Sequence, residues 1–309
     1  MGPFLLVLFA HAIGVSHAHA ASPAEVYWHA VLPKTPMPGA IRDLLADKEA
    51  RTAVNVSEGG LSFNISKGKN FARLGNSYIY NYRSRATKIE DRFATIFFLQ
   101  KDVVHPGANK TIHFIRTSSG ATLLPRRMAD SIPFSSIKLP EMLARLSINP
   151  NSTEAESMKK PLQDCEAPPV DGETKYCATS LDSMVDFSTS TLGTRNIRAL
   201  STTLDNHATP KQVYTMSKVQ KLAGSKFVSC HVMNYIYAVF YCHSQSTVAY
   251  TLSMVGKDGT KVEAVAACHT NTAEFNPQYV AFQVLHVKPG TVPICHFLLE
   301  NGILWSPNK

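Results

Sequence analysis

Short hydrophobic runs, rich in β-branched and aromatic residues, follow one another through the last third of the chain. They lie at residues 213–216, 226–230, 237–241, 248–252, 262–265, 280–284 and 291–294. Runs of this length and composition are typical of β-strands, and glycines between them, such as Gly259 and Gly290, suit tight turns. Because parallel strands need long crossover connections, the short spacing predicts mainly antiparallel pairing.

The middle of the chain shows helix-start patterns instead. Residues 153–156 have the form of a capping box, and Ser180 precedes an apolar segment at 181–186. Cys165 and Cys177 flank a turn-rich segment between the two, and we expect them to form a disulfide that joins a helical hairpin. The predicted fold class is therefore α+β: a disulfide-stapled helical section, then a mainly antiparallel β-sheet or barrel.

The N-terminal region predicts a leader and an arm rather than a second domain. Residues 4–15 are an apolar stretch too short to span a bilayer, and small residues at 18 and 20 fit a signal peptidase site. We expect a signal peptide at 1–20, a loosely ordered, polar and glycine-rich arm at 21–92, and one domain at 93–309. No later apolar run reaches membrane-spanning length, so we expect a secreted protein with no membrane partner.

Composition and short motifs narrow the function classes. Hydrophobic residues make up 44% of the 309 residues, enough for a sizeable core, and the net charge is +8. The basic residues are scattered and form no nucleic-acid-binding signature, and no hydrolase or phosphate-binding motif is present. Four sequons that fit secretion predict glycosylation at Asn55, Asn64, Asn109 and Asn151.

Four Cys-His dipeptides in the β-rich region carry the most specific chemistry. They are Cys230-His231, Cys242-His243, Cys268-His269 and Cys295-His296. Successive residues of a strand point to opposite faces, so an extended Cys-His pair places its sulfur on one side and its imidazole on the other. The four sulfurs could form two disulfides, and the four imidazoles could converge on a metal ion.

Two alternatives to a histidine metal site stay open at this point. The four histidines could hydrogen-bond within the core and hold no metal, or reduced cysteines could join them as zinc ligands. Imidazole suits copper, zinc and nickel, copper(II) binds most tightly among the divalent ions, and cysteines held in disulfides offer no thiolate. Copper is therefore the expected cofactor.

The same residues resemble a known family. The Cys-His repeat, with residues 234–243 and 287–296, is similar to the BURP domain, a plant-specific module of secreted proteins. Residues 96–107, 133–140 and 175–186 resemble earlier parts of that domain, and 27–38 resemble the segment after the leader in its seed and dehydration-responsive branches. The resemblance implies that the metal ligands are His231, His243, His269 and His296.

The resemblance implies two classes of function. Many members are wall-associated or storage-compartment proteins of developing or stressed tissue, and a basic protein in the apoplast would be attracted to the acidic wall polysaccharide pectin. Other members are copper-dependent peptide cyclases that crosslink Tyr or Trp side chains, often within their own N-terminal region. In this chain Tyr78, Tyr80 and Tyr82 are the expected crosslink acceptors. The arm also contains Tyr27-Trp28, which belongs to the segment shared with the seed and stress members. We expect the non-catalytic class, in an apoplastic, cell-wall or vacuolar storage location.

Overall fold

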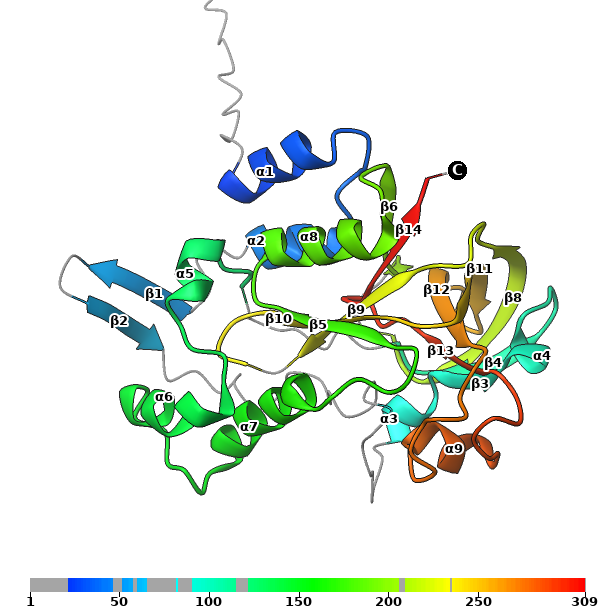
Figure 1. Ribbon diagram of the computed structural model, residues 1–309. Helices are drawn as coiled ribbons and strands as arrows, with labels where there is room; N and C mark the ends of the chain where they lie inside the picture. Colours follow the sequence, from blue (N-terminus) through cyan, green and yellow to red (C-terminus); the bar gives the residue numbers. More distant parts are fainter. Residues whose placement is uncertain are drawn as a thin grey trace, which may run out of the picture.

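The predicted α+β class is confirmed: two antiparallel sheets lie among helices (Figure 1). The computed structural model describes residues 22–46, 52–57, 60–65, 82, 91–114, 122–205, 209–233 and 235–308. The expected leader at 1–20 lies outside these ranges. A separate hairpin of β1 (Thr52–Ser57) and β2 (Gly60–Ile65) belongs to the arm.

The first large sheet has five strands. Their order is β5 (Thr174–Ala178), β10 (Val239–Ser244), β9 (Val228–Met233), β14 (Ile303–Pro307) and β6 (Ile197–Leu200). Every neighbouring pair is antiparallel. The strands β9 and β10 are buried along their whole length, so both of their faces are covered.

The second sheet has seven strands and continues from the first through a two-residue connection between β10 and β11. Its order is β3 (Phe97–Leu99), β13 (Ile294–Phe297), β12 (Lys261–His269), β11 (Thr247–Gly256), β8 (Gln212–Lys221) and β4 (Asn109–Ile112), with β7 (Thr203–Leu204) paired to β12. The predicted turn at Gly259 follows β11, and its φ of 86° is a conformation that favours glycine.

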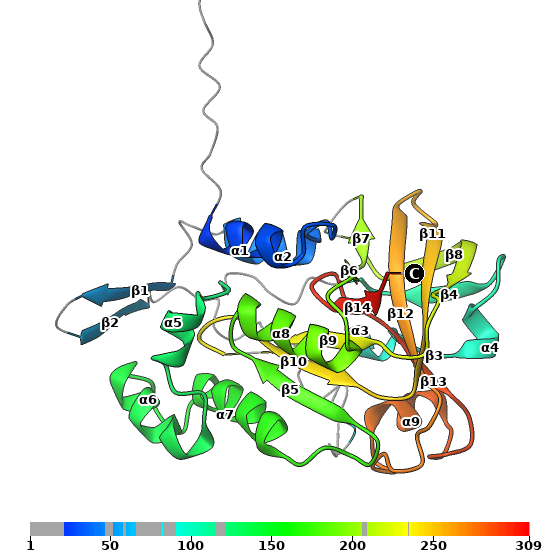
Figure 2. The same ribbon diagram turned by 45° about the horizontal axis from the view of Figure 1, so that its top comes forward.

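Helices cover both faces of the five-stranded sheet (Figures 1 and 2). On one face lie α1 (Pro23–Val31), α2 (Gly39–Ala46) and α8 (Leu181–Leu192), which share a core with Cys230 and Cys242. On the other lie η3 (Ser136–Lys138), α6 (Leu139–Arg145) and α7 (Thr153–Glu166), around Met233 and Tyr241. Helix α5 (Arg126–Asp130) lies at the side, where Arg126 forms an ion pair with Asp186 of α8. The short helices α3 (Asp91–Ala94), α4 (Gln100–Val103) and α9 (Val280–Leu285) lie near the second sheet.

Both predicted helix starts are found. Helix α8 begins after Ser180, whose side chain accepts a hydrogen bond from the backbone of Ser183 in a capping box, and it ends at Gly193 with φ of 70°. Helix α7 begins at the predicted position, although its N-cap is Ser152 rather than Thr153. In both cases the cap oxygen satisfies a backbone N–H that the first turn leaves unpaired.

Three predictions about local structure were wrong. Residues 280–284 form helix α9 rather than a strand, because a short apolar run fits either element and Phe282 is buried here in helical form. The strand predicted at 291–294 begins only at Ile294. The Cys165–Cys177 disulfide joins the end of α7 to strand β5, not two helices of a hairpin.

The beginning of the expected arm packs into the domain. Trp28 of α1 is completely buried, with its ring 5.7 Å from that of Trp305 in β14. Its indole N–H donates to the carbonyl of Thr35 at 2.7 Å, and the Thr35 hydroxyl donates to the carbonyl of Ile197. Residues 22–46 are therefore held to the five-stranded sheet by a buried aromatic pair and by hydrogen bonds.

Candidate metal centre

Each Cys-His dipeptide lies in a strand, as the alternation argument requires. The four strands are β9, β10, β12 and β13. Cys230 and Cys242 belong to the core that α8 covers. Met233 follows His231 by two residues and so lies on the same face of the strand, and it packs with α7 on the opposite side of the sheet. The extended backbone thus separates sulfur from imidazole.

Disulfides account for all six cysteines of the chain. Cys230–Cys242 and Cys268–Cys295 each link residues that stand directly opposite each other in paired strands, and Cys165–Cys177 is the predicted third bridge. With no free cysteine, the alternative of mixed Cys/His zinc ligands is wrong. The Cys230–Cys242 and Cys268–Cys295 disulfides lie one residue from each histidine and hold each strand pair in register.

The four imidazoles gather into one closed group. Nε2 of His231 lies 3.2 Å from Nε2 of His243, and Nε2 of His269 lies 3.3 Å from Nε2 of His296. The two pairs face each other, with ring centroids 5.6 Å apart for His231 and His296 and 5.8 Å apart for His243 and His269. One pair comes from each sheet, so the site lies where the two sheets meet.

Burial keeps these histidines neutral. At most 2% of each residue is exposed. Burial lowers the pKa of His243 from its usual 6.5 to about 3 and that of His296 to about 4, and it holds the pKa values of His231 and His269 well below 6.5. A neutral imidazole keeps one ring nitrogen with a lone pair, which is the form that binds a metal.

Neighbouring groups orient two of the rings. Nδ1 of His296 lies 3.3 Å from the carbonyl oxygen of Phe297, so it carries the proton and Nε2 keeps its lone pair. Nδ1 of His269 lies 3.3 Å from the hydroxyl of Thr247, the residue opposite it in β11. Contacts of this kind at the outer nitrogen are typical of histidines that hold metals through the other nitrogen.

Tyr82, from the arm, reaches into the histidine group. Its hydroxyl lies 2.9 Å from Nε2 of His269, and 3.3 and 3.4 Å from Nδ1 and Nε2 of His243. Its ring stacks on Phe275 at 4.0 Å, and only 1% of the residue is exposed. A phenol oxygen is therefore part of the site.

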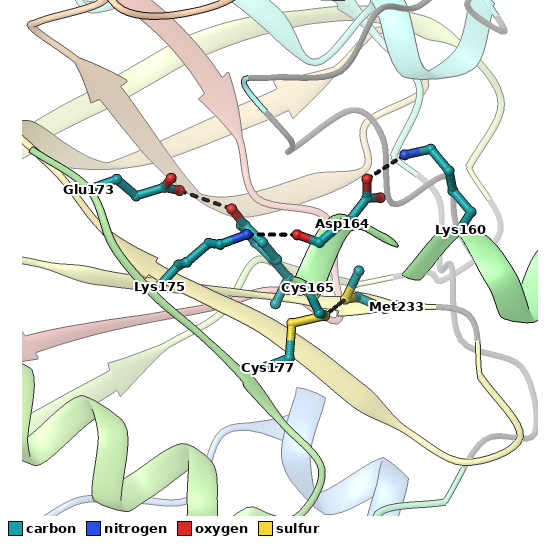
Figure 3. Close-up of a disulfide and its surroundings, with 8 residues drawn as sticks. Lys160, Asp164, Cys165, Glu173, Lys175, Cys177 and Met233 are labelled. Carbon is teal, nitrogen blue, oxygen red and sulfur yellow. Dashed lines mark hydrogen bonds and ion pairs between the residues drawn. A yellow bond between two sulfur atoms is a disulfide. The ribbon is translucent and has the colours of Figure 1, made fainter. Parts of the chain in front are cut away.

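A buried acidic and basic network borders the site on β5 and α7 (Figure 3). The hydroxyl of Tyr241 donates to Glu173 Oε1 at 2.9 Å, and the same oxygen lies 4.0 Å from Nδ1 of His243. Burial, then the Glu173 charge, hold the pKa of Tyr241 well above its usual value. Lys175 donates to the carbonyl of Asp164 at 2.7 Å, beside the Cys165–Cys177 disulfide (Figure 3).

Within each histidine pair, the distance between the two Nε2 atoms fits two ligands of one metal ion. Two imidazole nitrogens bound to one tetrahedral ion at ~2.0 Å would be about 3.3 Å apart. The distances of 3.2 and 3.3 Å match this value. As the side chains stand, no group of three or more His, Cys, Asp or Glu residues in the described ranges is arranged to hold a metal ion.

The other predicted site residues lie elsewhere. Asn109 on β4 and Asn151 before α7 are exposed, whereas Asn55 and Asn64 belong to the β1–β2 hairpin. Tyr78 and Tyr80 lie outside the described residues. Glu173 and the aromatic residue Phe275 could not be predicted as site residues, because both reach the site through tertiary contacts. None of the helices in the described ranges combines the length and the apolar composition that a membrane span requires.

Known proteins match the chain over most of its length. A family model described as the BURP domain matches residues 96–307. The rice BURP domain-containing protein 2 is 43% identical, and the match covers 98% of each chain. The rice BURP domain-containing protein 3 is 52% identical over 74% of this chain but only 54% of its own length. The Arabidopsis BURP domain protein RD22 is 46% identical over 74% of this chain and 60% of its own.

Proposed function

The chain belongs to the BURP domain family, and from that premise we propose that it is a secreted plant protein of the cell wall or a storage compartment that binds copper through its histidine group. It acts in development or in the response to stress. The observation that carries the copper proposal is the convergence of four buried, neutral imidazoles from two sheets at one place.

The donor set favours copper over the other divalent ions. Four imidazoles without a thiolate suit copper, and copper(II) has the highest affinity in the divalent series. His231, His243, His269 and His296 would hold the ion. The Cys230–Cys242 and Cys268–Cys295 disulfides would keep the ligand strands in register in an oxidising compartment.

Copper content is the direct test of this proposal. Protein secreted by plant cells should contain one copper ion per chain by elemental analysis, and a His296→Gln variant should lose most of it. His105→Gln is the matched control, because His105 is exposed and its Nδ1 contacts only the neighbouring carbonyl of Pro106 among the bonds described. Secreted protein without copper that also fails to take it up from solution would refute the proposal.

Wall association follows from the positive charge. A protein with net charge +8 is attracted to the carboxylates of de-esterified pectin, and salt screens such an attraction. The protein should be retained on immobilised polygalacturonate at low ionic strength and released by sodium chloride. Retention that does not change with salt would contradict an electrostatic contact with pectin.

Tyr82 favours a second candidate function, an autocatalytic peptide cyclase. Its phenol lies 2.9 Å from Nε2 of His269, where a redox-active copper ion would supply one-electron oxidation. The net reaction would join an arm tyrosine to another arm residue with loss of two hydrogen atoms, while dioxygen accepts them as hydrogen peroxide. Incubation with copper and air should then lower the mass of a tyrosine-containing arm peptide by two hydrogens. An unchanged mass would refute the cyclase proposal and leave the non-catalytic one.

A further inference from the structure

The place of Tyr82 among the histidines points to a role beyond that of a residue to be modified. We propose that the Tyr82 phenol oxygen is a fifth ligand of the copper ion, so that the arm itself closes the metal site. This inference rests on the proposed copper binding. It assigns to a residue outside the Cys-His repeat a function that the repeat alone does not indicate.

The distances place the phenol oxygen where a ligand would be. Two donor atoms that bind one ion at ~2.0 Å and at right angles are about 2.8 Å apart. The Tyr82 oxygen lies 2.9 Å from Nε2 of His269 and 3.4 Å from Nε2 of His243. These two distances lie close to the 3.2 and 3.3 Å between the nitrogens within the histidine pairs, and mixed nitrogen and oxygen ligands suit copper(II).

The segment after β12 holds Tyr82 in this position. The Tyr82 ring lies parallel to Phe275, with the centroids 4.0 Å apart and the planes at 9°, and Tyr279 packs edge-on against it at 5.5 Å. The Tyr82 carbonyl accepts a hydrogen bond from the N–H of Asn276 at 2.8 Å. Ring and backbone are both fixed, so the oxygen is aimed at the histidines before any ion arrives, which lowers the entropy cost of ligation.

Ligation by Tyr82 has two consequences. The phenol gives up its proton to solvent when its oxygen binds copper(II), and the resulting phenolate-to-copper charge transfer absorbs visible light. The oxygen also fills a coordination position that a small external ligand would otherwise take. A four-histidine site without Tyr82 would lack the charge-transfer absorption and would not exclude a small external ligand.

The experiment is a copper(II) titration of the full chain, followed by visible absorption and resonance Raman spectroscopy. The wild-type protein should develop a charge-transfer band in the blue-violet region, with Raman modes of a phenolate excited within that band. Tyr82→Phe should bind one copper ion but lack both. Tyr279→Phe is the matched control, because it removes another buried phenol of the same aromatic group and should keep the band.

Azide gives a second measurement, and its wild-type result does not depend on the variant folding. Wild-type copper protein should show no azide-to-copper band, whereas Tyr82→Phe should show one. A wild-type protein that binds copper without phenolate modes, or that takes up azide freely, would overturn the inference while leaving the histidine site intact. A wild-type protein that binds no copper would instead refute the proposed function, so the two failures are distinguishable.

Discussion

Acid should destabilise the metal-free protein, because unfolding exposes buried histidines to protonation. Burial lowers the pKa of His243 to about 3 and that of His296 to about 4, whereas both return to 6.5 in the unfolded chain. Between these values the unfolded state binds more protons than the folded state. The stability that these histidines contribute is therefore fully present above pH 6.5. It is lost as the pH decreases from the unfolded-state pKa of 6.5 toward the folded-state pKa values.

The loss is large compared with the stability of a domain. Each pH unit below the unfolded pKa costs about 1.4 kcal/mol per histidine, so a decrease from pH ~6.5 to pH ~5 costs about 2 kcal/mol for each of these two residues. The sum of about 4 kcal/mol is a substantial part of a typical stability of ~5–15 kcal/mol. Burial lowers the pKa values of His231 and His269 as well, which adds to the loss.

Chemical denaturation with disulfides intact and a chelator present measures this effect. The free energy of unfolding should fall by several kcal/mol from pH ~7 to pH ~5. His296→Gln should reduce this fall in the free energy of unfolding by the contribution of one histidine, about 2 kcal/mol. His105→Gln, at an exposed position, should leave the fall unchanged. Equal stability at both pH values would show that the histidines are not buried in neutral form, and would refute the reasoning. Copper-loaded protein should lose at least as much over this range, because imidazoles bound to the ion take up no protons in the folded state whereas the unfolded chain still takes them up.

Three further predictions concern parts of the molecule around the site. Replacing both Cys165 and Cys177 by alanine should cost about 3 kcal/mol in denaturant unfolding, since their separation is 12 residues, and an unchanged midpoint would contradict this. Trp28→Ala should cost roughly 3–5 kcal/mol by the same measurement, against almost nothing for the exposed Val26→Ala, because only Trp28 is fully buried. Glu173→Gln should weaken copper binding about 10–100-fold in competition with a chelator, because the carboxylate lies 4.0 Å from Nδ1 of His243; equal affinity would mean that Glu173 does not support the ligand.

Features that depend on local chemistry could be predicted from the sequence. The strand alternation that separates Cys230 from His231, the cap at Ser180 and the turn at Gly259 each follow from a few neighbouring residues. The convergence of the histidines could also be predicted, because each extended Cys-His dipeptide places its cysteine on one face of the strand and its histidine on the other. These are the parts of the fold that short-range rules determine.

Features that depend on tertiary contacts could not be predicted. The run at 280–284 is compatible with a strand or a helix, and only its packing as α9 decides between them. Glu173 reaches His243 because β5 pairs with β10 in one register, which no local pattern encodes. The burial of Trp28 against Trp305 likewise depends on residues far apart in the chain, so a segment that looks like an arm becomes part of the core.

The ligand count of the bound metal tests the central claim most directly. X-ray absorption at the copper edge of the loaded wild-type protein should show the scattering of four imidazole rings at ~2.0 Å and no sulfur. That result would confirm that His231, His243, His269 and His296 bind a single ion from two sheets. Scattering from two imidazoles or fewer, or from sulfur, would contradict it.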